Sequence, residues 1–152
     1  MQTFSLFALA LLCVPGIAAA DGDDPMLVQN PGGFHWKPKD ALPPGAFGAV
    51  VHGDPTKGDY DFFGRFPDGF TVPLHTHTND CSVVMVKGSM VIARPGRADV
   101  EIGEGGYFLL PGKMSYVARC QKACTFLVHG DKPFDIIYLD PKDDPRLRAA
   151  AR

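Results

Sequence analysis

Short apolar segments separated by turn residues make up most of the chain after residue 45. Clusters of Gly, Pro and Asp recur roughly every 8–12 residues, and no stretch has the periodicity of a long amphipathic helix. The pattern predicts strands over residues 46–52, 60–66, 70–77, 82–86, 89–93, 99–102, 107–110, 115–120, 124–129 and 134–139. Many short strands with regular turns are typical of an all-β sandwich or barrel.

The whole chain divides into four segments. Residues 1–20 read as a signal peptide, residues 21–45 as an irregular N-terminal arm, residues 46–141 as the barrel and residues 142–152 as a C-terminal tail. The arm carries Phe34-His35-Trp36, and its aromatic side chains are expected to pack on the barrel. The tail, which includes Arg146, is expected to be solvated and frayed.

Composition agrees with one packed domain. The chain has 152 residues, 45% of them apolar, and its 17 Gly and 14 Pro favour short strands joined by turns. The formal net charge is -2 and there is no long basic run, so nothing predicts a nucleic-acid partner.

The N-terminal segment predicts export. Residues from Phe4 to Ala20 are apolar and uncharged, and the run ends in three alanines before an acidic stretch. This is the pattern of a secretory signal peptide cleaved near Ala20, although its n-region lacks Lys or Arg. Pro15 breaks the run and argues against a membrane anchor, and Leu12 before Cys13 argues against a lipid anchor. We therefore expect a periplasmic or secreted protein with no stable membrane anchor.

The mature chain keeps three cysteines, Cys81, Cys120 and Cys124. Disulfides persist outside the cytosol. Cys120 and Cys124 flank a short polar loop, and a hairpin of strands 115–120 and 124–129 would place them opposite each other, within disulfide reach. The alternative is two free thiols, and Cys81 is left unpaired in either case.

A pair of histidines follows a turn glycine in the strand at residues 70–77. His75 and His77 are two residues apart, so in an extended strand both point to one side, about 7 Å apart. Two imidazoles aimed into one concavity are the start of a metal site. The alternative is two surface histidines in a loop.

Two segments resemble the motifs of a known superfamily. Gly69-x5-His75-x-His77-x3-Cys81-x6-Gly88 resembles the first cupin motif, G-x5-H-x-H-x3,4-E-x6-G. Gly105-x5-Pro111-x-Lys113-x2-Tyr116-x3-Cys120 resembles the second, G-x5-P-x-G-x2-H-x3-N. Phe34-His35-Trp36, Gly53-Asp54-Pro55 and Val128-His129-Gly130 further resemble the ChrR-like cupins and the related DUF4437-type proteins.

The resemblance implies a double-stranded β-helix, or jelly-roll barrel, that binds a metal at its mouth and commonly dimerises. The family's usual ligands are two His and a Glu from the first motif and a His from the second. Here only His75 and His77 match, because Cys81 takes the Glu position and Tyr116 takes the position of the second-motif His.

Three interpretations of this ligand set stay open. In the first, Cys81 is a thiolate ligand, because it keeps the strand parity of His75 and His77 if the backbone between them stays regular. A Cys ligand favours Zn or Cu, whereas the family resemblance favours Fe or Mn, and Tyr116 or His129 completes the set. In the second, hydrogen bonds hold His75 and His77 in a polar pocket without tight metal binding. In the third, the barrel is a scaffold whose site has decayed.

Two further residues are candidates. His129 is attractive as a pocket residue by resemblance, but the expected hairpin register turns its side chain away from that of Tyr116. Asp80 lies three residues after His77 and is a candidate ligand or supporting carboxylate, with an exposed loop acid as the alternative.

Three functions follow from these observations. The first is a cupin with a metal- or small-ligand-binding pocket built around His75 and His77. The second is a metal-dependent, dioxygenase-like enzyme acting on a small organic substrate. The third is a non-catalytic scaffold or interaction barrel.

Overall fold

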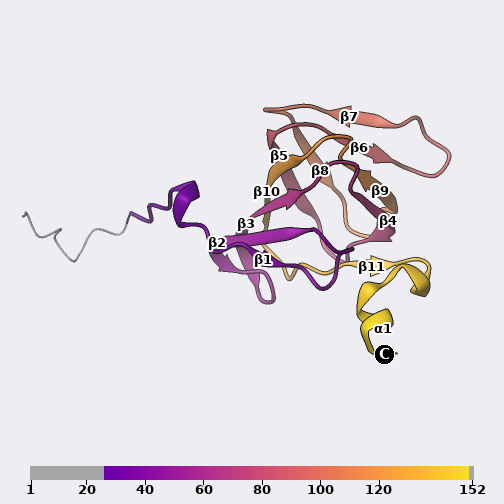
Figure 1. The fold of residues 1–152 in the computed structure, drawn as a ribbon, viewed down its shortest axis with the longest axis horizontal. Helices are drawn as coiled ribbons and strands as arrows, with labels where there is room; N and C mark the ends of the chain where they lie inside the picture. The colour runs from indigo at the N-terminus through magenta and orange to yellow at the C-terminus, as the bar shows by residue number, and fades with distance from the viewer. Residues whose placement is uncertain (1–25, 151–152) are drawn as a thin grey trace, which may run out of the picture.

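Two antiparallel β-sheets face each other and make up most of the molecule (Figure 1). The structure is a computed structural model that describes residues 26–150, and the signal peptide predicted near Ala20 lies outside these residues. The six-stranded sheet has the order β1 (Lys37–Pro38), β2 (Phe47–Asp54), β3 (Gly58–Phe66), β10 (Cys124–Gly130), β5 (Cys81–Lys87), β8 (Tyr107–Leu110). The five-stranded sheet has the order β11 (Ile137–Tyr138), β4 (Thr71–Thr76), β9 (Tyr116–Arg119), β6 (Met90–Ala93), β7 (Val100–Ile102).

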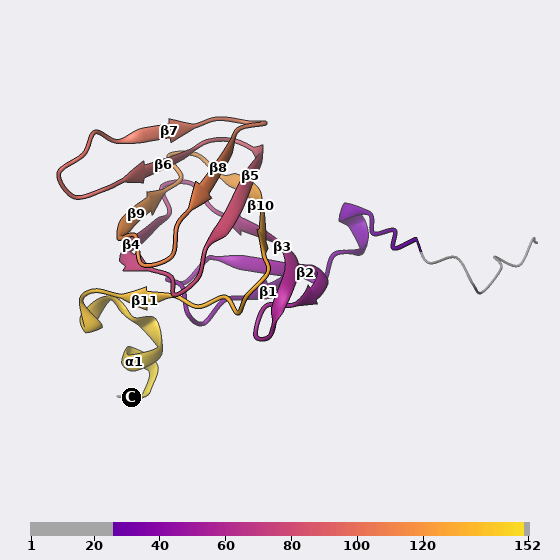
Figure 2. The same ribbon diagram turned by 180° about the vertical axis from the view of Figure 1, so that it is seen from behind.

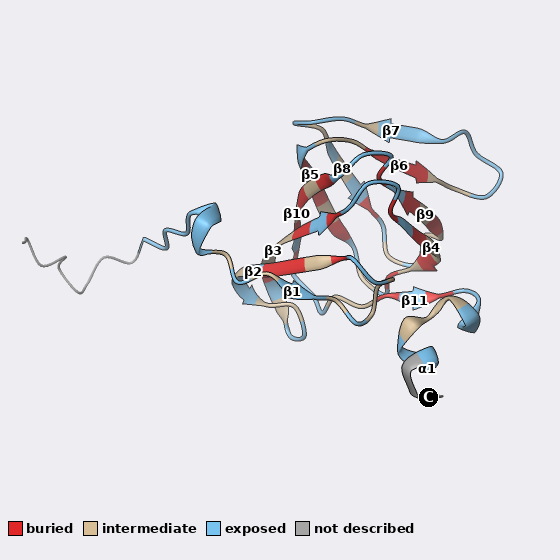
Figure 3. Ribbon diagram, in the orientation of Figure 1, coloured by how far each residue is buried: buried red, intermediate tan, exposed pale blue. Residues whose placement is uncertain are grey.

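The core lies between the two sheets. In β10 every second residue is buried, from Cys124 through Phe126 and Val128 to Gly130, and β5 shows the same alternation. One face of each of these strands therefore packs inward while the other faces outward. Figure 3 shows the buried segments concentrated on the strands that enclose the interior. The predicted all-β jelly roll is confirmed.

The expected hairpin of β9 and β10 is wrong. β9 pairs with β4 and β6 in one sheet, whereas β10 pairs with β3 and β5 in the other. Both edges of each strand are therefore already paired, which leaves no edge at which β9 and β10 could pair with each other. The predicted disulfide is nevertheless present between Cys120 and Cys124, whose Cα atoms are 6.0 Å apart. It joins the two sheets where the chain crosses between them.

The N-terminal arm packs on the outside of the six-stranded sheet. β1 pairs with β2, and the ring of Phe34 lies 4.8 Å from that of Phe63 on β3. The guanidinium of Arg65 lies 4.5 Å from the centre of the Trp36 ring, a cation–π contact. The aromatics of the arm therefore pack on the barrel.

The C-terminal tail is folded, in contrast to the frayed segment expected. It contains the short 3-10 helix η2 (Pro141–Asp143) and helix α1 (Pro145–Ala150), which lie below β11 in both views (Figures 1 and 2). Arg146 donates to the carbonyl of Ile136 at 2.9 Å and pairs with Asp144, which ties α1 to the loop before β11. Over residues 26–150, the structure has no helix with the length and apolar character needed to cross a membrane.

Candidate functional site

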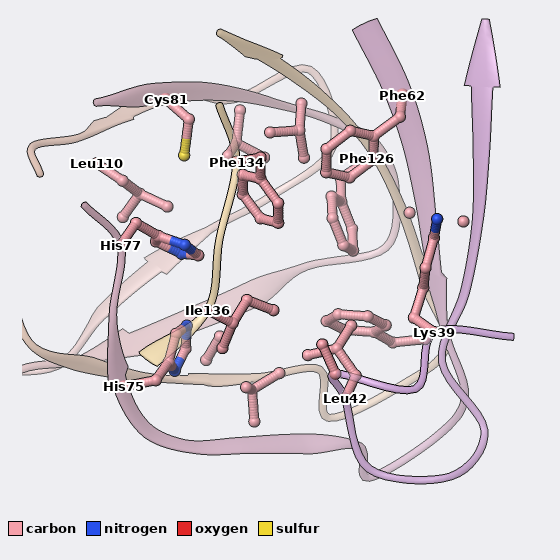
Figure 4. A pocket seen from close by; sticks show the side chains of 18 of the residues that line it. Lys39, Leu42, Phe62, His75, His77, Cys81, Leu110, Phe126, Phe134 and Ile136 are labelled. Atoms are coloured by element: carbon pink, nitrogen blue, oxygen red, sulfur yellow. The ribbon is translucent and has the colours of Figure 1, made fainter. Parts of the chain in front are cut away.

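A pocket of about 300 Å³ opens between the two sheets (Figure 4). This volume is at the lower end of the range for small-molecule sites. Both sheets and the loops at the mouth supply its apolar wall, which includes Leu42, Phe62, Phe66, Val83, Phe108, Phe126, Val128, Phe134 and Ile136. The polar side chains His75, His77 and Tyr116 lie together in the remaining part of the wall.

His75 lies on β4 and is 3% exposed. Its cross-strand partners are Tyr116 on β9 and Tyr138 on β11, so the three side chains form a row across the sheet. Its Nδ1 lies 2.7 Å from the carbonyl oxygen of Pro73. A carbonyl can only accept, so Nδ1 carries the proton and Nε2 bears a lone pair.

The lone pair of His75 Nε2 has no hydrogen-bond partner among the described residues. In that part of the chain, no fully buried side-chain nitrogen or oxygen is left unpaired. Nε2 is therefore open to the cavity rather than sealed in the core, and it can accept a hydrogen bond from a bound molecule.

His77 follows the end of β4 and is 5% exposed. Its Nδ1–H donates to the carbonyl of Asp135, and its Nε2 accepts from the Tyr116 hydroxyl at 2.7 Å. The His75 and His77 ring centres lie 5.2 Å apart with their planes nearly perpendicular. Figure 4 shows the two imidazoles on the same side of the pocket. Unlike His75, His77 has both ring nitrogens engaged.

Burial determines the protonation states of His75, His77 and Tyr116. Loss of solvent lowers the pKa of His75 to about 4, and it lowers the pKa of His77 as well. Burial also raises the pKa of Tyr116 well above its usual range, and the nearby Cys81 adds to that effect. At neutral pH the site therefore consists of two neutral imidazoles and a neutral phenol that donates its proton to His77.

Cys81 enters the pocket from the other sheet. β4 ends at Thr76, and Cys81 begins β5 after a bend, so the strand parity that would have aligned it with the histidines does not apply. The thiol is 3% exposed, and burial raises its pKa to about 12. At neutral pH Cys81 is a protonated, free thiol in the pocket wall.

The donor set does not fit a resident transition metal. Structural and catalytic sites use three or four protein donors, and among residues 26–150 no group of three or more His, Cys, Asp or Glu converges in this way. The second imidazole already has its Nε2 lone pair bound by Tyr116. Only the Nε2 of His75 is free among the two imidazoles, so we derive no step through a metal.

Asp80 and His129 lie outside the pocket lining. Asp80 is exposed, and its carboxylate accepts from the backbone N–H of Gly112 at 2.7 Å, which fixes a loop. His129 is on the outer face of β10, where its Nδ1 lies 3.0 Å from Asp61. Its neighbours on β10, Val128 and Gly130, point inward, so strand alternation turns His129 away from the cavity.

The structure adds pocket residues that the sequence did not indicate. Lys39 follows β1, Phe134 and Asp135 lie in the loop before β11, and Arg146 lies on α1. The Phe134 ring packs 4.8 Å from the His77 ring. None of these residues lies in either motif, and their sequence separation from the histidines gives no signal of proximity.

Two sheets closed around a pocket with histidines at β4 define a jelly-roll barrel of the cupin type. Neither a protein-family model nor a curated protein sequence matches the chain. Solved structures do match it, and they show that the chain has the cupin fold.

Three of these structures show the extent of the likeness. The polyketide cyclase RemF from Streptomyces resistomycificus has a TM-score of 0.64 at 16% identity, over 82% of this chain and 93% of that one. A putative acetylacetone dioxygenase from Methylibium petroleiphilum has a TM-score of 0.61 at 16% identity, over 87% and 98%. An RmlC-like cupin from Ralstonia eutropha has a TM-score of 0.59 at 20% identity, over 76% and 73%.

Proposed function

We propose that the protein binds a small, mainly apolar organic molecule in the barrel pocket and recognises its polar group with the histidine cluster. The observation that carries this proposal is the free Nε2 lone pair of His75 at the wall of a mainly apolar cavity. A cavity of about 300 Å³ holds the volume of about ten liquid waters at about 30 Å³ each. It therefore suits a molecule with about as many non-hydrogen atoms, or slightly more.

The chemistry of the wall defines the preferred ligand. Apolar side chains stabilise an aromatic or aliphatic body by removing it from water. The neutral imidazole of His75 is an acceptor, so the ligand should present a donor such as a hydroxyl. Tyr116 and His77 already satisfy each other, and they position the second imidazole next to the first.

The oxygenation that the cupin resemblance suggests finds less support. Such chemistry needs a metal held by several donors, and here only two imidazoles are in place, one of them occupied by Tyr116. The neighbours described as a cyclase and a putative dioxygenase show that the fold hosts small-molecule chemistry, without transferring either activity to this chain.

Titration calorimetry with 2-naphthol and 2-methoxynaphthalene tests the proposal. Only the naphthol can donate to His75, so it should bind about 3–10-fold more tightly, the worth of one neutral hydrogen bond. The preference should disappear in His75→Phe and persist in His35→Phe, whose side chain is exposed. Failure of both compounds to bind at millimolar concentration would contradict the proposal.

We also propose that the mature protein is exported after cleavage near Ala20. The disulfide between Cys120 and Cys124 supports this, because such bonds persist in oxidising compartments. N-terminal sequencing of the exported protein should begin at Asp21. A sequence that begins at Met1 would refute the cleavage.

A further inference from the structure

One cationic side chain at the pocket has no protein partner. Lys39 lines the cavity, and no hydrogen bond or ion pair joins its ammonium to another residue of the described chain. Figure 4 shows it on the side of the pocket opposite the two histidines. The backbone of Lys39 is fixed, since its N–H donates to Ala46 at 3.1 Å and its carbonyl accepts from Leu42 at 2.9 Å.

The fold makes room for this side chain with two paired glycines. Gly48 on β2 lies opposite Gly64 on β3, and Gly64 lies opposite Phe126 on β10. A Cβ at Gly48 would come within 2.2 Å of the Lys39 Cε, so the lysine stem lies directly on the bare backbone of β2. The Phe126 ring covers Gly64 in the same way. Lys39 is therefore packed against the barrel wall with its stem on apolar surroundings and its charge at the end.

The other charged side chains of the pocket lining already form hydrogen bonds or ion pairs within the protein. The Asp135 carboxylate accepts from the backbone N–H and the hydroxyl of Thr78. Arg146 is engaged by Asp144 and by the carbonyl of Ile136. Lys39 is thus the only charged side chain of the lining that is left to pair with a bound molecule, within the part of the chain that the structure describes.

We propose that Lys39 is a specificity-determining residue that selects small organic anions, namely carboxylates whose apolar, aromatic-sized body also carries a hydroxyl for His75. The inference deepens the proposed ligand-binding function and rests on it. The carboxylate pairs with the Lys39 ammonium in a charge-assisted hydrogen bond, and the body fills the apolar cavity. Because Lys39 is half-buried and lines the cavity, this pairing is screened less than an ion pair between fully exposed groups.

The test compares 6-hydroxy-2-naphthoate with 6-hydroxy-2-naphthamide, which has the same shape, the same hydroxyl for His75 and no charge, by titration calorimetry on the oxidised mature protein. Wild type should bind the carboxylate about tenfold more tightly than the amide, a difference of about 1.4 kcal/mol. Lys39→Gln should remove the preference by weakening carboxylate binding about tenfold relative to amide binding, and Lys39→Arg should retain the preference. Lys37→Gln, an exposed neighbour on β1, is the matched control and should behave as wild type.

A second variant tests the packing of the Lys39 stem on Gly48 without removing the lysine charge. Gly48→Ala should displace the flexible end of Lys39 and weaken binding of the hydroxynaphthoate about three- to tenfold relative to that of the hydroxynaphthamide. Equal affinity of wild type for the two compounds, or a carboxylate preference that survives Lys39→Gln, would overturn the anion inference and leave the proposed pocket intact. Failure of both compounds to bind wild type would overturn the proposed function and this inference together.

Discussion

At the scale of single residues, the Tyr116 hydroxyl decides what His77 can do. It donates to His77 Nε2 at 2.7 Å in a region where both side chains are at most 5% exposed. Tyr116→Phe removes the donor and leaves a buried acceptor without a partner, so the free energy of unfolding should fall by about 1–3 kcal/mol. Urea unfolding measures this change. Tyr107→Phe, at a side chain that is 64% exposed, is the control, and equal stability of Tyr116→Phe and wild type would show that the contact adds nothing.

The buried His75 makes stability depend on pH in a defined direction. Its pKa is about 4 in the folded protein, whereas the ordinary value for an exposed histidine is 6.5. Between these values the unfolded chain binds more protons, so stability is full above about pH 6.5 and falls as the pH drops toward 4. The gap corresponds to about 3 kcal/mol at 1.36 kcal/mol per pH unit.

His75→Gln should therefore flatten this dependence. Unfolding free energies measured in urea from pH 4.5 to 7.5 should fall less steeply in the variant than in wild type, by up to about 3 kcal/mol across the range. His35→Gln, at an exposed side chain of the arm, is the matched control. Parallel profiles for His75→Gln and wild type would contradict the assignment of His75 as a buried neutral imidazole.

At the scale of elements, the disulfide links strands that do not pair with each other. Cys120 directly follows β9 and Cys124 begins β10, so the disulfide spans the connection where the chain passes from one sheet to the other. Closing so short a loop should stabilise by only about 2 kcal/mol on the chain-entropy account.

Reduction of the wild type should lower the free energy of unfolding by about 2 kcal/mol. Urea unfolding with and without dithiothreitol measures this change. The variant with both Cys120→Ala and Cys124→Ala should not respond to the reductant. If complete reduction, verified by thiol titration, leaves wild-type stability unchanged, the disulfide does not constrain the unfolded chain as argued.

The strands themselves could be predicted from sequence, but their pairing could not. Apolar segments and turn residues located nearly every strand within a residue or two, because both signals are local. Gly88 is one such signal: its φ is 77°, and a Cβ there would lie 2.6 Å from the Ala123 carbonyl oxygen. Assigning β9 and β10 to different sheets depends on long-range packing. A short loop between two apolar segments is equally compatible with a hairpin and with a crossover.

Only part of the candidate site could be predicted from the sequence. His75 and His77 stood out because their spacing is local and because they match a known motif. Cys81 was placed by strand parity, which fails once the chain bends and changes sheet. Lys39 and Arg146 reach the pocket from the arm and the tail, and nothing in their own segments marks them. Candidate ligands can thus be recognised from a sequence motif, whereas the residues that line a pocket can be identified only from the three-dimensional fold.

At the scale of the whole molecule, the pocket volume depends on how closely the two sheets and their side chains approach. Gly64 on β3 affects this volume locally, because the Phe126 side chain from the neighbouring strand of the same sheet covers it and a Cβ there would come within 2.3 Å of the Phe126 ring. Phe126 belongs to both the core and the pocket wall. A larger residue at position 64 must therefore push the ring into the cavity or strain the sheet.

Gly64→Ala should consequently affect binding and stability together. The free energy of unfolding should fall by about 1–3 kcal/mol, as for other overpacked cores, and 6-hydroxy-2-naphthamide should bind at least tenfold more weakly because the displaced ring occupies its space. Urea unfolding and calorimetry measure the two effects on the same protein. Gly103→Ala is the control, since nothing lies within 4 Å of a Cβ at that position. If Gly64→Ala lost stability but bound the amide as wild type does, the ligand would have to sit elsewhere than beside Phe126, and the assignment of this cavity as the binding site would be wrong.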